Sequence, residues 1–559
     1  MRKTKVVLAK VLTAAMFISS FAGVQGITSE AAAKPKLSKK SVSITVGKTK
    51  KVTVKNAKKY KVSWKIKSKK VASFKKSGKY AVKVKAKKAG KTTLTATIKK
   101  GKKTKKLVCK ITVKKVKAPV NTPTTSPKTT EVPTVKPTAT ATAEPQDTTP
   151  AMKEIFKGVI DNVGTCLTYN QTWNNRKEMQ DVSTMEFVDK NFNSFTLENE
   201  MKPDSMLNKH NMISVADAKA KGYVISDDYK ESAVPELTLE TIDGVLAIAK
   251  QHNIRMRAHT LMWHQQTPTW FFKKNYDDEE AVVDEATMNA RLEFFVRTVM
   301  RYTMQKEKEL TGEVGSIVYA WDVLNEYIHR SNAAAAATWV SVYGDMGLKP
   351  TYVKAAFEYA YDELKRENVQ DKVTLFYNDY DTYFSVDDEL ALISYINEGE
   401  EAKICGGIGM QSHVDIKRPT LEEYGNALKA FINAGLEVQI TELDITINFD
   451  TDDTDGRTPT YAYKNEKETD ADQAAFTKDF IKQIVDIQKN RDKTKSPKGI
   501  TGITVWGISD QTSWRGGCKP LFFTRKKVGR VKDETTGKYK PVYTYVPKKS
   551  YEAMIEALK

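Results

Sequence analysis

The chain has 559 residues, which is too long for one ordinary hydrophobic core, so we expect two or more domains. Its net charge of +23 suggests a polyanion-binding protein, but the charge is unevenly distributed. Residues 34–117 contain 33 Lys and no Arg, Asp or Glu, whereas residues 151–559 carry a net charge of −12. The composition therefore excludes a uniformly basic protein and indicates a basic module joined to a mildly acidic larger domain.

Residues 1–33 have the pattern of a secretory signal peptide. A basic start is followed by an apolar stretch over residues 6–24 and by three alanines at positions 31–33. The alternative is an uncleaved membrane anchor, which is disfavoured because Lys10 interrupts the apolar run. No later segment is long and apolar enough to span a bilayer. We therefore expect a secreted, extracellular protein, with attachment to the cell surface as a further hypothesis.

Residues 34–117 are predicted to form a small antiparallel β-sandwich, because apolar and polar residues alternate in short runs between Gly- and Lys-rich turns. The strand with Trp64, the following VASF and the later AGKTTLTA resemble the bacterial Ig-like repeats of group 2. The outward lysines could contact anionic cell-wall polymers or acidic polysaccharide, or could simply keep a spacer soluble, and both readings stay open. Nucleic acid is not expected as a partner, because the module lacks Arg and a secreted chain rarely meets it.

Residues 118–150 are rich in Pro and Thr and have almost no large apolar side chain. Such a segment cannot bury a core and is expected to be an extended, semi-rigid linker. It predicts a domain boundary just before residue 151.

From residue 151 onward, short apolar segments alternate with longer amphipathic ones. The eight predicted strands span residues 156–164, 192–198, 254–263, 317–325, 372–379, 406–412, 436–444 and 499–507. The predicted helices include residues 241–251, 286–305, 352–368, 421–435 and 472–490. This alternation favours an α/β fold, a (β/α)8 barrel over residues 151–559 with insertions at 208–236, 447–470 and 524–545. A doubly wound sheet is the alternative, but no Gly-rich phosphate-binding turn follows the first strand.

Polar and aromatic residues gather where the predicted strands end. In (β/α)8 barrels, chemistry takes place at the C-terminal ends of the strands. Seven of the eight ends carry carboxylates, amides, imidazoles or indoles, which packing alone does not explain. These residues are Glu198, Asn199, Lys202, His259, Trp263, His264, Gln266, Asn325, Glu326, Asn378, Asp379, Gln411, His413, Glu442, Asp444, Trp506, Trp514 and Arg515.

Glu326 and Glu442 are candidates for the paired carboxyl groups of a glycosidase. Breaking a glycosidic bond needs one acid that protonates the departing oxygen and a second group that meets the oxocarbenium-like carbon. The amide of Asn325 lies beside Glu326 in the sequence and could hold a sugar hydroxyl. A surface salt bridge is the alternative for two such glutamates, but the polar cluster around them argues against it.

The runs at these strand ends, in chain order, resemble glycoside hydrolase family 10, the endo-xylanases. The runs are FTLENEMKPD (195–204), RAHTLMWHQQTPTWF (257–271), WDVLNE (321–326), LFYNDYD (375–381), GIGMQSH (407–413), VQITELDI (438–445) and VWGISDQTSWR (505–515). The resemblance implies that Glu326 is the acid/base and Glu442 the nucleophile of a retaining double displacement, with carboxyl groups about 5–5.5 Å apart. It also implies that Glu326 is protonated and Glu442 ionised in the resting enzyme.

The resemblance further implies substrate-binding roles. Trp263, Trp506 and Trp514 offer flat apolar faces on which pyranose rings can stack, although each alone is more readily a core residue. His413, with Asp444 behind it, is expected to fix the orientation and charge of Glu442. The other binding residues that the resemblance implies are Glu198, Asn199, Lys202, His259, Gln266, Asn325, Gln411 and His413 itself.

The favoured function is endo-acting hydrolysis of internal β-1,4 bonds in xylan or xylo-oligosaccharides. The alternatives are a β-1,4-glucanase of similar barrel type and a non-catalytic cell-wall polysaccharide-binding protein, the latter disfavoured by the presence of both glutamates. No metal or organic cofactor is expected, because the sequence holds no credible ligand cluster. The four cysteines, Cys109, Cys166, Cys405 and Cys518, lack metal-ligand spacing. A bridge between Cys166 and Cys518 and free thiols both stay open.

Overall fold

The computed structural model describes residues 35–39, 41–45, 49–57, 60–100, 103–114, 149–171, 176–207, 211–329, 333–448, 468–532 and 539–559. The predicted signal peptide (1–33), nearly all of the predicted linker (118–150) and most of the predicted insertion at 447–470 lie outside these residues. The described residues form two compact units, one within Ser20–Glu144 and the other within Pro145–Lys559.

The smaller unit consists of two four-stranded sheets that share one apolar core. Its strands are β1 (Lys36–Leu37), β2 (Ser41–Thr45), β3 (Thr49–Lys55), β4 (Lys61–Ile66), β5 (Ala72–Gly78), β6 (Ala81–Ala86), β7 (Gly90–Lys100) and β8 (Lys103–Lys114). The sheets have the orders β1-β3-β6-β5 and β2-β8-β7-β4. Val52 and Val82 of the first sheet share a buried cluster with Leu94 and Ile111 of the second. The module is therefore all-β as predicted, although β2 and β8 pair in parallel.

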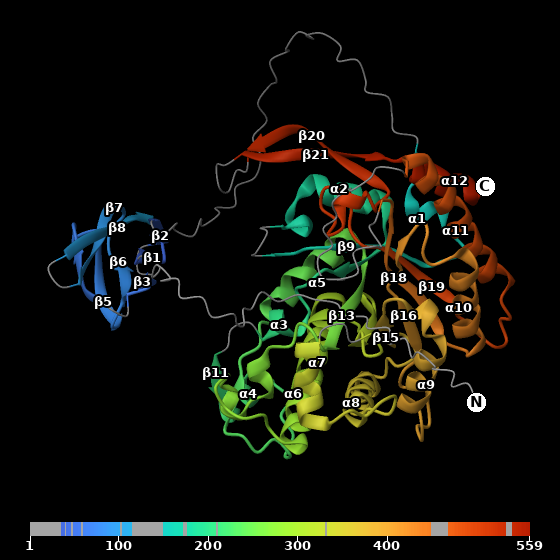
Figure 1. Cartoon of the computed structure of the whole chain (residues 1–559), viewed down its shortest axis with the longest axis horizontal. Coiled ribbons are helices and arrows are strands. Elements are labelled where there is room, and N and C mark those ends of the chain that lie inside the picture. Colours follow the sequence, from blue (N-terminus) through green and yellow to red (C-terminus); the bar gives the residue numbers. More distant parts are fainter. Residues whose placement is uncertain are drawn as a thin grey trace, which may run out of the picture. The chain divides into compact units, whose positions relative to one another are not determined.

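The larger unit is an eight-stranded parallel barrel surrounded by helices (Figure 1). Its strands are β9 (Asn162–Leu167), β10 (Ser194–Leu197), β13 (Arg255–Trp263), β14 (Val318–Asn325), β15 (Thr374–Asp379), β16 (Gly407–Met410), β18 (Glu437–Thr446) and β19 (Ile500–Val505). Each strand pairs in parallel with the next, β16 pairs with β18, and β19 pairs with β9 to close the ring. This confirms the (β/α)8 architecture. The short strand β17 (His413–Asp415) pairs with the end of β18.

The helices of the larger unit lie between the strands. Besides one short helix in an inserted segment described below, they are α1 (Met152–Ile155), α2 (Val182–Asn191), α3 (Pro203–Met206), α5 (Glu240–His252), α6 (Glu285–Thr311), α7 (Ala333–Tyr343), α8 (Thr351–Glu367), α9 (Val386–Ile396), α10 (Leu421–Asn433), α11 (Asp470–Asn490) and α12 (Lys549–Ala557). Among the described residues, no helix is both long and apolar enough to cross a membrane.

The first strand was predicted to begin too early, at residue 156. Residues 156–161 follow α1 as a turn, in which the amide of Ile160 donates to the carbonyl of Phe156 over 3.0 Å. Both side chains are buried in the core, so they gave this turn the apolar pattern of a strand. The other seven predicted strands lie within a few residues of the observed ones.

Two of the predicted insertions form small elements of their own. Residues 208–236 contain β11 (Met212–Ser214), α4 (Val215–Ala220) and β12 (Ala233–Pro235). Residues 524–545 belong to a two-stranded antiparallel ribbon, β20 (Phe523–Lys532) and β21 (Tyr539–Pro547), which is drawn beside α2 in Figure 1.

Candidate active site

Glu326 and Glu442 come from strands on different sides of the barrel and are both buried at its C-terminal end. Glu326 directly follows β14 and adopts a left-handed backbone conformation, with φ of 57°. Its amide donates to the carbonyl of Asn378 at the end of β15 over 2.9 Å. Glu442 lies within β18. The exposed fractions of the two residues are 8% and 5%, so both carboxyl groups are largely removed from water.

A short chain of side-chain amides links the two glutamates. Gln411 donates to Glu326 Oε1 over 3.0 Å and to Asn325 Oδ1 over 3.3 Å. Asn378 donates to Asn325 Oδ1 over 2.9 Å and to Glu442 Oε1 over 3.0 Å. The structure therefore brings these five strand-end residues into one network. Both hydrogen bonds to Asn325 end on its oxygen, which leaves its Nδ2 donor directed away from these two neighbours.

The carboxyl group of Glu326 has the environment of a proton donor. Burial and the negative charge of Asp379 raise its pKa to about 7. The indole nitrogen of Trp263 donates to Glu326 Oε2 over 2.8 Å, and Gln265 Nε2 lies 3.4 Å from the same oxygen. A carboxylic acid with a pKa near 7 stays protonated in mildly acidic solution and can deliver its proton to a leaving group.

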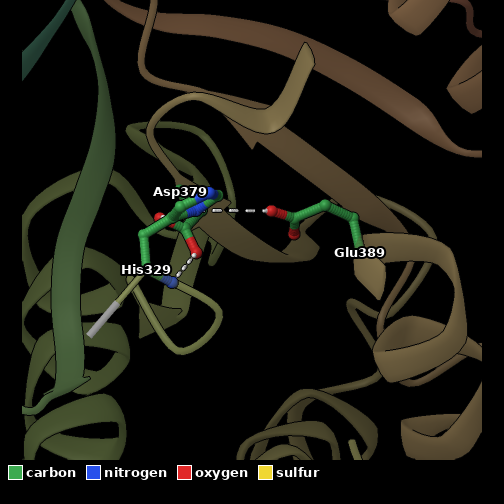
Figure 2. A group of neighbouring side chains, drawn as sticks. All are labelled: His329, Asp379 and Glu389. Carbon is green, nitrogen blue, oxygen red and sulfur yellow. Dashed lines mark hydrogen bonds and ion pairs between the residues drawn. The ribbon is translucent and has the colours of Figure 1, made fainter. Parts of the chain in front are cut away.

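Asp379 also belongs to a charged group with His329 and Glu389 (Figure 2), in which the two carboxylates are buried and His329 is partly buried. His329 Nδ1 lies 3.3 Å from Asp379 Oδ1, and Tyr377 donates its hydroxyl to Asp379 Oδ2. Ligand atoms of the three residues lie within 4.8 Å of one another, the one arrangement among the described residues that could hold a metal ion. We interpret it as an ion pair, because the charge of Asp379 outweighs burial and raises the pKa of His329.

Glu442 has the opposite environment, that of an ionised nucleophile. Burial alone raises its pKa, but the hydrogen bond with His413 and the charges of nearby His259 and His413 outweigh burial and lower it. His413 Nε2 lies 3.2 Å from Glu442 Oε2, and His413 Nδ1 lies 2.9 Å from Asp444 Oδ2. Burial disfavours the imidazolium, yet the charge and hydrogen bond of Asp444 raise the pKa of His413 to about 9.

Asp444 also connects this pair to Trp514 and Arg515. Trp514 donates its indole N–H to Asp444 Oδ2 over 3.1 Å, and Arg515 Nη1 donates to Asp444 Oδ1 over 2.7 Å. The exposed fraction of Trp514 is 47%; its ring lies edge-on to His413 with centroids 5.0 Å apart, and the guanidinium of Arg515 lies 5.4 Å from its ring centre. Trp506 is buried and makes an edge contact with His259.

His259 is held by a buried ion pair that the sequence analysis did not single out. His259 Nδ1 lies 3.0 Å from Asp322 Oδ2, and Arg257 Nε donates to the same oxygen over 3.1 Å. Arg257 Nη1 also donates to Gln439 Oε1 over 2.8 Å. Because His259 Nδ1 is turned towards Asp322, Nε2 is the ring nitrogen that faces away from this carboxylate. The sequence signal for this ion pair was a charged residue in the middle of each of two consecutive apolar strands, namely Arg257 and Asp322.

Glu198, Asn199 and Lys202 follow β10 and form the predicted polar group. Lys202 Nζ lies 3.5 Å from Asn199 Oδ1 and 4.8 Å from the centre of the Trp263 ring. Arg176, from the segment before α2, donates to Glu198 Oε2 over 2.6 Å. Arg176 was missed because it lies in an irregular loop and not at a strand end.

Of the adjacent Gln265 and Gln266, Gln266 was predicted to bind substrate, and this role stays a prediction. Gln266 Nε2 donates to Asp204 Oδ2 over 3.2 Å, whereas the side chain of Gln265 points to Glu326. The structure thus brings Gln265, and not Gln266, next to the candidate acid. Two adjacent glutamines after a strand give no sequence signal for which one turns inward.

All four cysteines are buried free thiols, so the bridge considered between Cys166 and Cys518 is not formed. Burial raises the pKa of Cys166 well above its usual value, which keeps this thiol neutral and a weak nucleophile. None of the four is suited to a catalytic role in this state.

Comparison with known proteins finds the same family that the strand-end motifs resemble. The model of glycosyl hydrolase family 10 matches residues 151–544. Endo-1,4-β-xylanase A of Butyrivibrio fibrisolvens is 40% identical over 354 residues, covering 63% of this chain and 77% of that protein. Endo-1,4-β-xylanase B of the same organism is 31% identical over 368 residues, covering 63% of this chain and 50% of that protein.

A solved structure with a similar fold is that of the family 10 and carbohydrate-binding modules of endo-1,4-β-D-xylanase 10B from Clostridium thermocellum in complex with xylohexaose. It aligns with a TM-score of 0.50 and 26% identity, covering 72% of this chain and 67% of that chain. The family match falls on the larger unit, where the two glutamates lie.

Proposed function

Because the chain belongs to glycosyl hydrolase family 10, we propose that it is a secreted endo-1,4-β-xylanase in which Glu326 and Glu442 carry out the reaction. Hydrolysis in this family proceeds with retention of anomeric configuration. The observation that carries the residue assignment is the pair of buried glutamates with opposite pKa shifts at the catalytic end of one barrel.

In the first step, Glu442 attacks the anomeric carbon while Glu326 gives its proton to the departing glycosidic oxygen. The bond to the leaving sugar breaks, and a covalent glycosyl–Glu442 ester forms. In the second step, Glu326, now ionised, takes a proton from water, and the resulting hydroxide displaces Glu442 from the anomeric carbon. The two inversions give net retention.

The surrounding residues support both steps. His413, charged and held by Asp444, stabilises the ionised form of Glu442. Asn325 Nδ2 is free to bind a sugar hydroxyl next to Glu326. Lys202 and the partly exposed Trp514 are suited to bind sugar rings near the two glutamates.

The assignment is tested with Glu442→Ala. We expect loss of xylan hydrolysis by several orders of magnitude, because a covalent step cannot proceed without its nucleophile. Incubating the wild-type enzyme with a slow 2-fluoro xylobioside should place the sugar on the peptide that contains residue 442. Unchanged hydrolysis by Glu442→Ala, or labelling of a different peptide, contradicts the assignment.

Xylan, rather than cellulose, is proposed as the substrate because the curated relatives in these comparisons are named xylanases. Comparing initial rates on xylan and on carboxymethyl-cellulose distinguishes the two, since a glucanase must accommodate a hydroxymethyl group on every ring. A higher rate on carboxymethyl-cellulose would reverse the proposal.

We also propose that the lysine-rich module contacts an anionic polymer of the cell wall. Strand pairing places exposed lysines directly opposite each other: Lys36 faces Lys55, and Lys83 faces both Lys51 and Lys75. Like charges in opposed positions destabilise a sheet, and residues 34–117 hold no carboxylate to neutralise them. An anionic polymer would relieve this repulsion. Deleting the module should lower the cell-bound fraction of secreted enzyme, and an unchanged fraction rejects the idea.

A further inference from the structure

The ribbon of β20 and β21 arises from the same face of the barrel as the candidate active site. It follows β19, the last barrel strand, and loops after barrel strands lie at the catalytic end. The root of the ribbon is the end formed by the pair Phe523–Pro547. Hydrogen bonds join this root to the segment that bears Trp506 and Trp514. Gln511 Oε1 accepts from the amide of Arg525 over 2.7 Å, and Phe523 O accepts from the amide of Asp510 over 3.1 Å.

The contacts of the root show in which direction the ribbon continues. Phe523 and Tyr545 both pack on Phe187 of α2, with ring centroids 4.9 and 4.2 Å away. Further from the root, the hydroxyl of Tyr545 lies 3.0 Å from the hydroxyl of Thr184, nearer the start of α2. That helix starts on the catalytic side, because it follows the loop after β9. The ribbon therefore leaves its root at the catalytic end of the barrel, beside the start of α2.

One face of the ribbon has a regular composition. Residues directly opposite in an antiparallel pair share a face, as do residues two apart on a strand. A bulge between Lys527 and Gly529 shifts the register by one residue, which keeps the pattern in phase on both strands. The opposed pairs on this face, which we call the ladder face, are Phe523–Pro547 at the root, then Arg525–Tyr545, Lys527–Tyr543 and Arg530–Pro541, with Tyr539 further along β21.

Beyond the root pair, each of the next three pairs of the ladder face places a basic residue opposite a tyrosine or a proline. The guanidinium of Arg525 lies 4.2 Å from the centre of the Tyr543 ring. Lys527 and Arg530 are exposed, and the exposed fraction of Tyr539 is 69%. The opposite face is different, with Thr524 opposite Val546 and Lys526 opposite Thr544.

This composition matches an acidic sugar polymer. Tyrosine rings stack on pyranose rings while their hydroxyls stay in water, and Lys and Arg pair with carboxylates. Residues 523–547 contain seven basic and two acidic residues, although residues 151–559 as a whole have a net charge of −12. A neutral xylan would use only the rings. A chain with uronic acid branches would use the rings and the cations together.

We propose that the ladder face is an accessory subsite that binds uronic acid branches of the xylan chain lying in the cleft. The proposal rests on the proposed xylanase function and specifies a substrate subclass for it. It assigns a role to the exposed residues Lys527 and Arg530, whereas packing on α2 accounts for Phe523 and Tyr545 at the root.

The test compares two charge-reversed variants of the full-length enzyme. Lys527→Glu/Arg530→Glu alters the ladder face, and Lys526→Glu/Lys540→Glu makes the same change in charge at positions off that face. For the first variant, we expect kcat/KM on glucuronoxylan to fall roughly five- to tenfold through a higher KM, as expected for two partly exposed ion pairs. On linear xylohexaose it should stay within about twofold of the wild type. The control variant should stay within that range on both substrates.

Raising the NaCl concentration should lower the wild-type preference for glucuronoxylan and leave hydrolysis of xylohexaose unchanged, because only the first depends on charge pairing. Equal losses in the two variants, equal losses on the two substrates, or no loss at all each overturn the proposal. If the wild type does not hydrolyse xylohexaose, the xylanase function itself fails, independently of the ladder face.

Discussion

His413 and Glu442 form a hydrogen-bonded ion pair in which the histidine has both ring nitrogens engaged by carboxylates. Nε2 faces Glu442 over 3.2 Å and Nδ1 faces Asp444 over 2.9 Å. Since both partners are acceptors, the ring must carry a proton on each nitrogen, in agreement with its raised pKa of about 9. The charge that keeps Glu442 ionised is therefore present throughout the neutral range.

Replacing His413 by Gln should move the acidic limb of the pH profile. Without the cation, the pKa of Glu442 rises, so kcat/KM should begin to fall at a higher pH as the solution is made more acidic. The measurement is kcat/KM on xylohexaose from pH 3 to 9, with wild type in parallel. A variant that is slower but keeps the wild-type acidic limb would show that His413 acts on geometry alone.

The same histidine makes folding stability depend on pH. Its folded pKa of about 9 lies above its usual unfolded value of about 6.5. The stabilisation is therefore fully present below about pH 6.5 and lost as pH rises through about 9, a change on the order of 3 kcal/mol. Urea unfolding of the larger unit at pH 6, 8 and 9.5 should show this loss, and His413→Gln should flatten it.

The alkaline limb of the pH profile of kcat/KM should follow the loss of the proton of Glu326. Its acid form is needed for the first step and is lost as pH rises through about 7. Asp379→Asn removes a negative charge that raises the pKa of Glu326, so the alkaline limb of this variant should move to lower pH. Circular dichroism melts check that the group around Asp379 still folds, and an unmoved limb in a folded variant contradicts the electrostatic account.

Trp263→Phe should shift the same limb in the opposite direction. The hydrogen bond from its indole lowers the pKa of Glu326, so its removal raises that pKa and moves the alkaline limb to higher pH. Phenylalanine keeps an aromatic face beside Lys202. Parallel shifts of Asp379→Asn and Trp263→Phe to lower pH would be incompatible with these two environments.

Asp322→Asn should destabilise the barrel and impair catalysis together. It leaves the fully buried guanidinium of Arg257 without its counter-ion, which costs about 3–5 kcal/mol. It also removes the carboxylate that orients His259. A thermal melt and kcat/KM on xylohexaose check both effects, with Gln439→Leu as a variant that removes the other partner of Arg257 and keeps the carboxylate.

The barrel could be predicted because its strands are buried on both sides and read as short apolar runs between amphipathic helices. Seven of eight were placed correctly in this way. Residues 156–161 were not, since Phe156 and Ile160 are equally apolar in a turn. Strand ends likewise located Glu326 and Glu442, because the fold brings all such ends to one face.

The side-chain contacts that the sequence did not reveal depend on the direction in which each side chain points across the barrel. Which of Gln265 and Gln266 reaches Glu326 is decided by the local backbone after β13. The pairing of Arg257 with Asp322 depends on the register of β13 against β14, which pairs Arg257 with Ala320 and His259 with Asp322. The ladder face depends on a bulge that no alternation pattern would have located.

The closing of the ring by β19 against β9 has a consequence for biosynthesis. The first barrel strand can complete its pairing only after the last strand has been made, and that strand lies more than three hundred residues later in the chain. A nascent polypeptide that already contains Glu326 and Glu442 still has two unpaired edges and lacks Trp506 and Trp514. We therefore expect the barrel and its active site to form only after this C-terminal strand has been made, and a chain interrupted before it to expose edges that can pair with other chains.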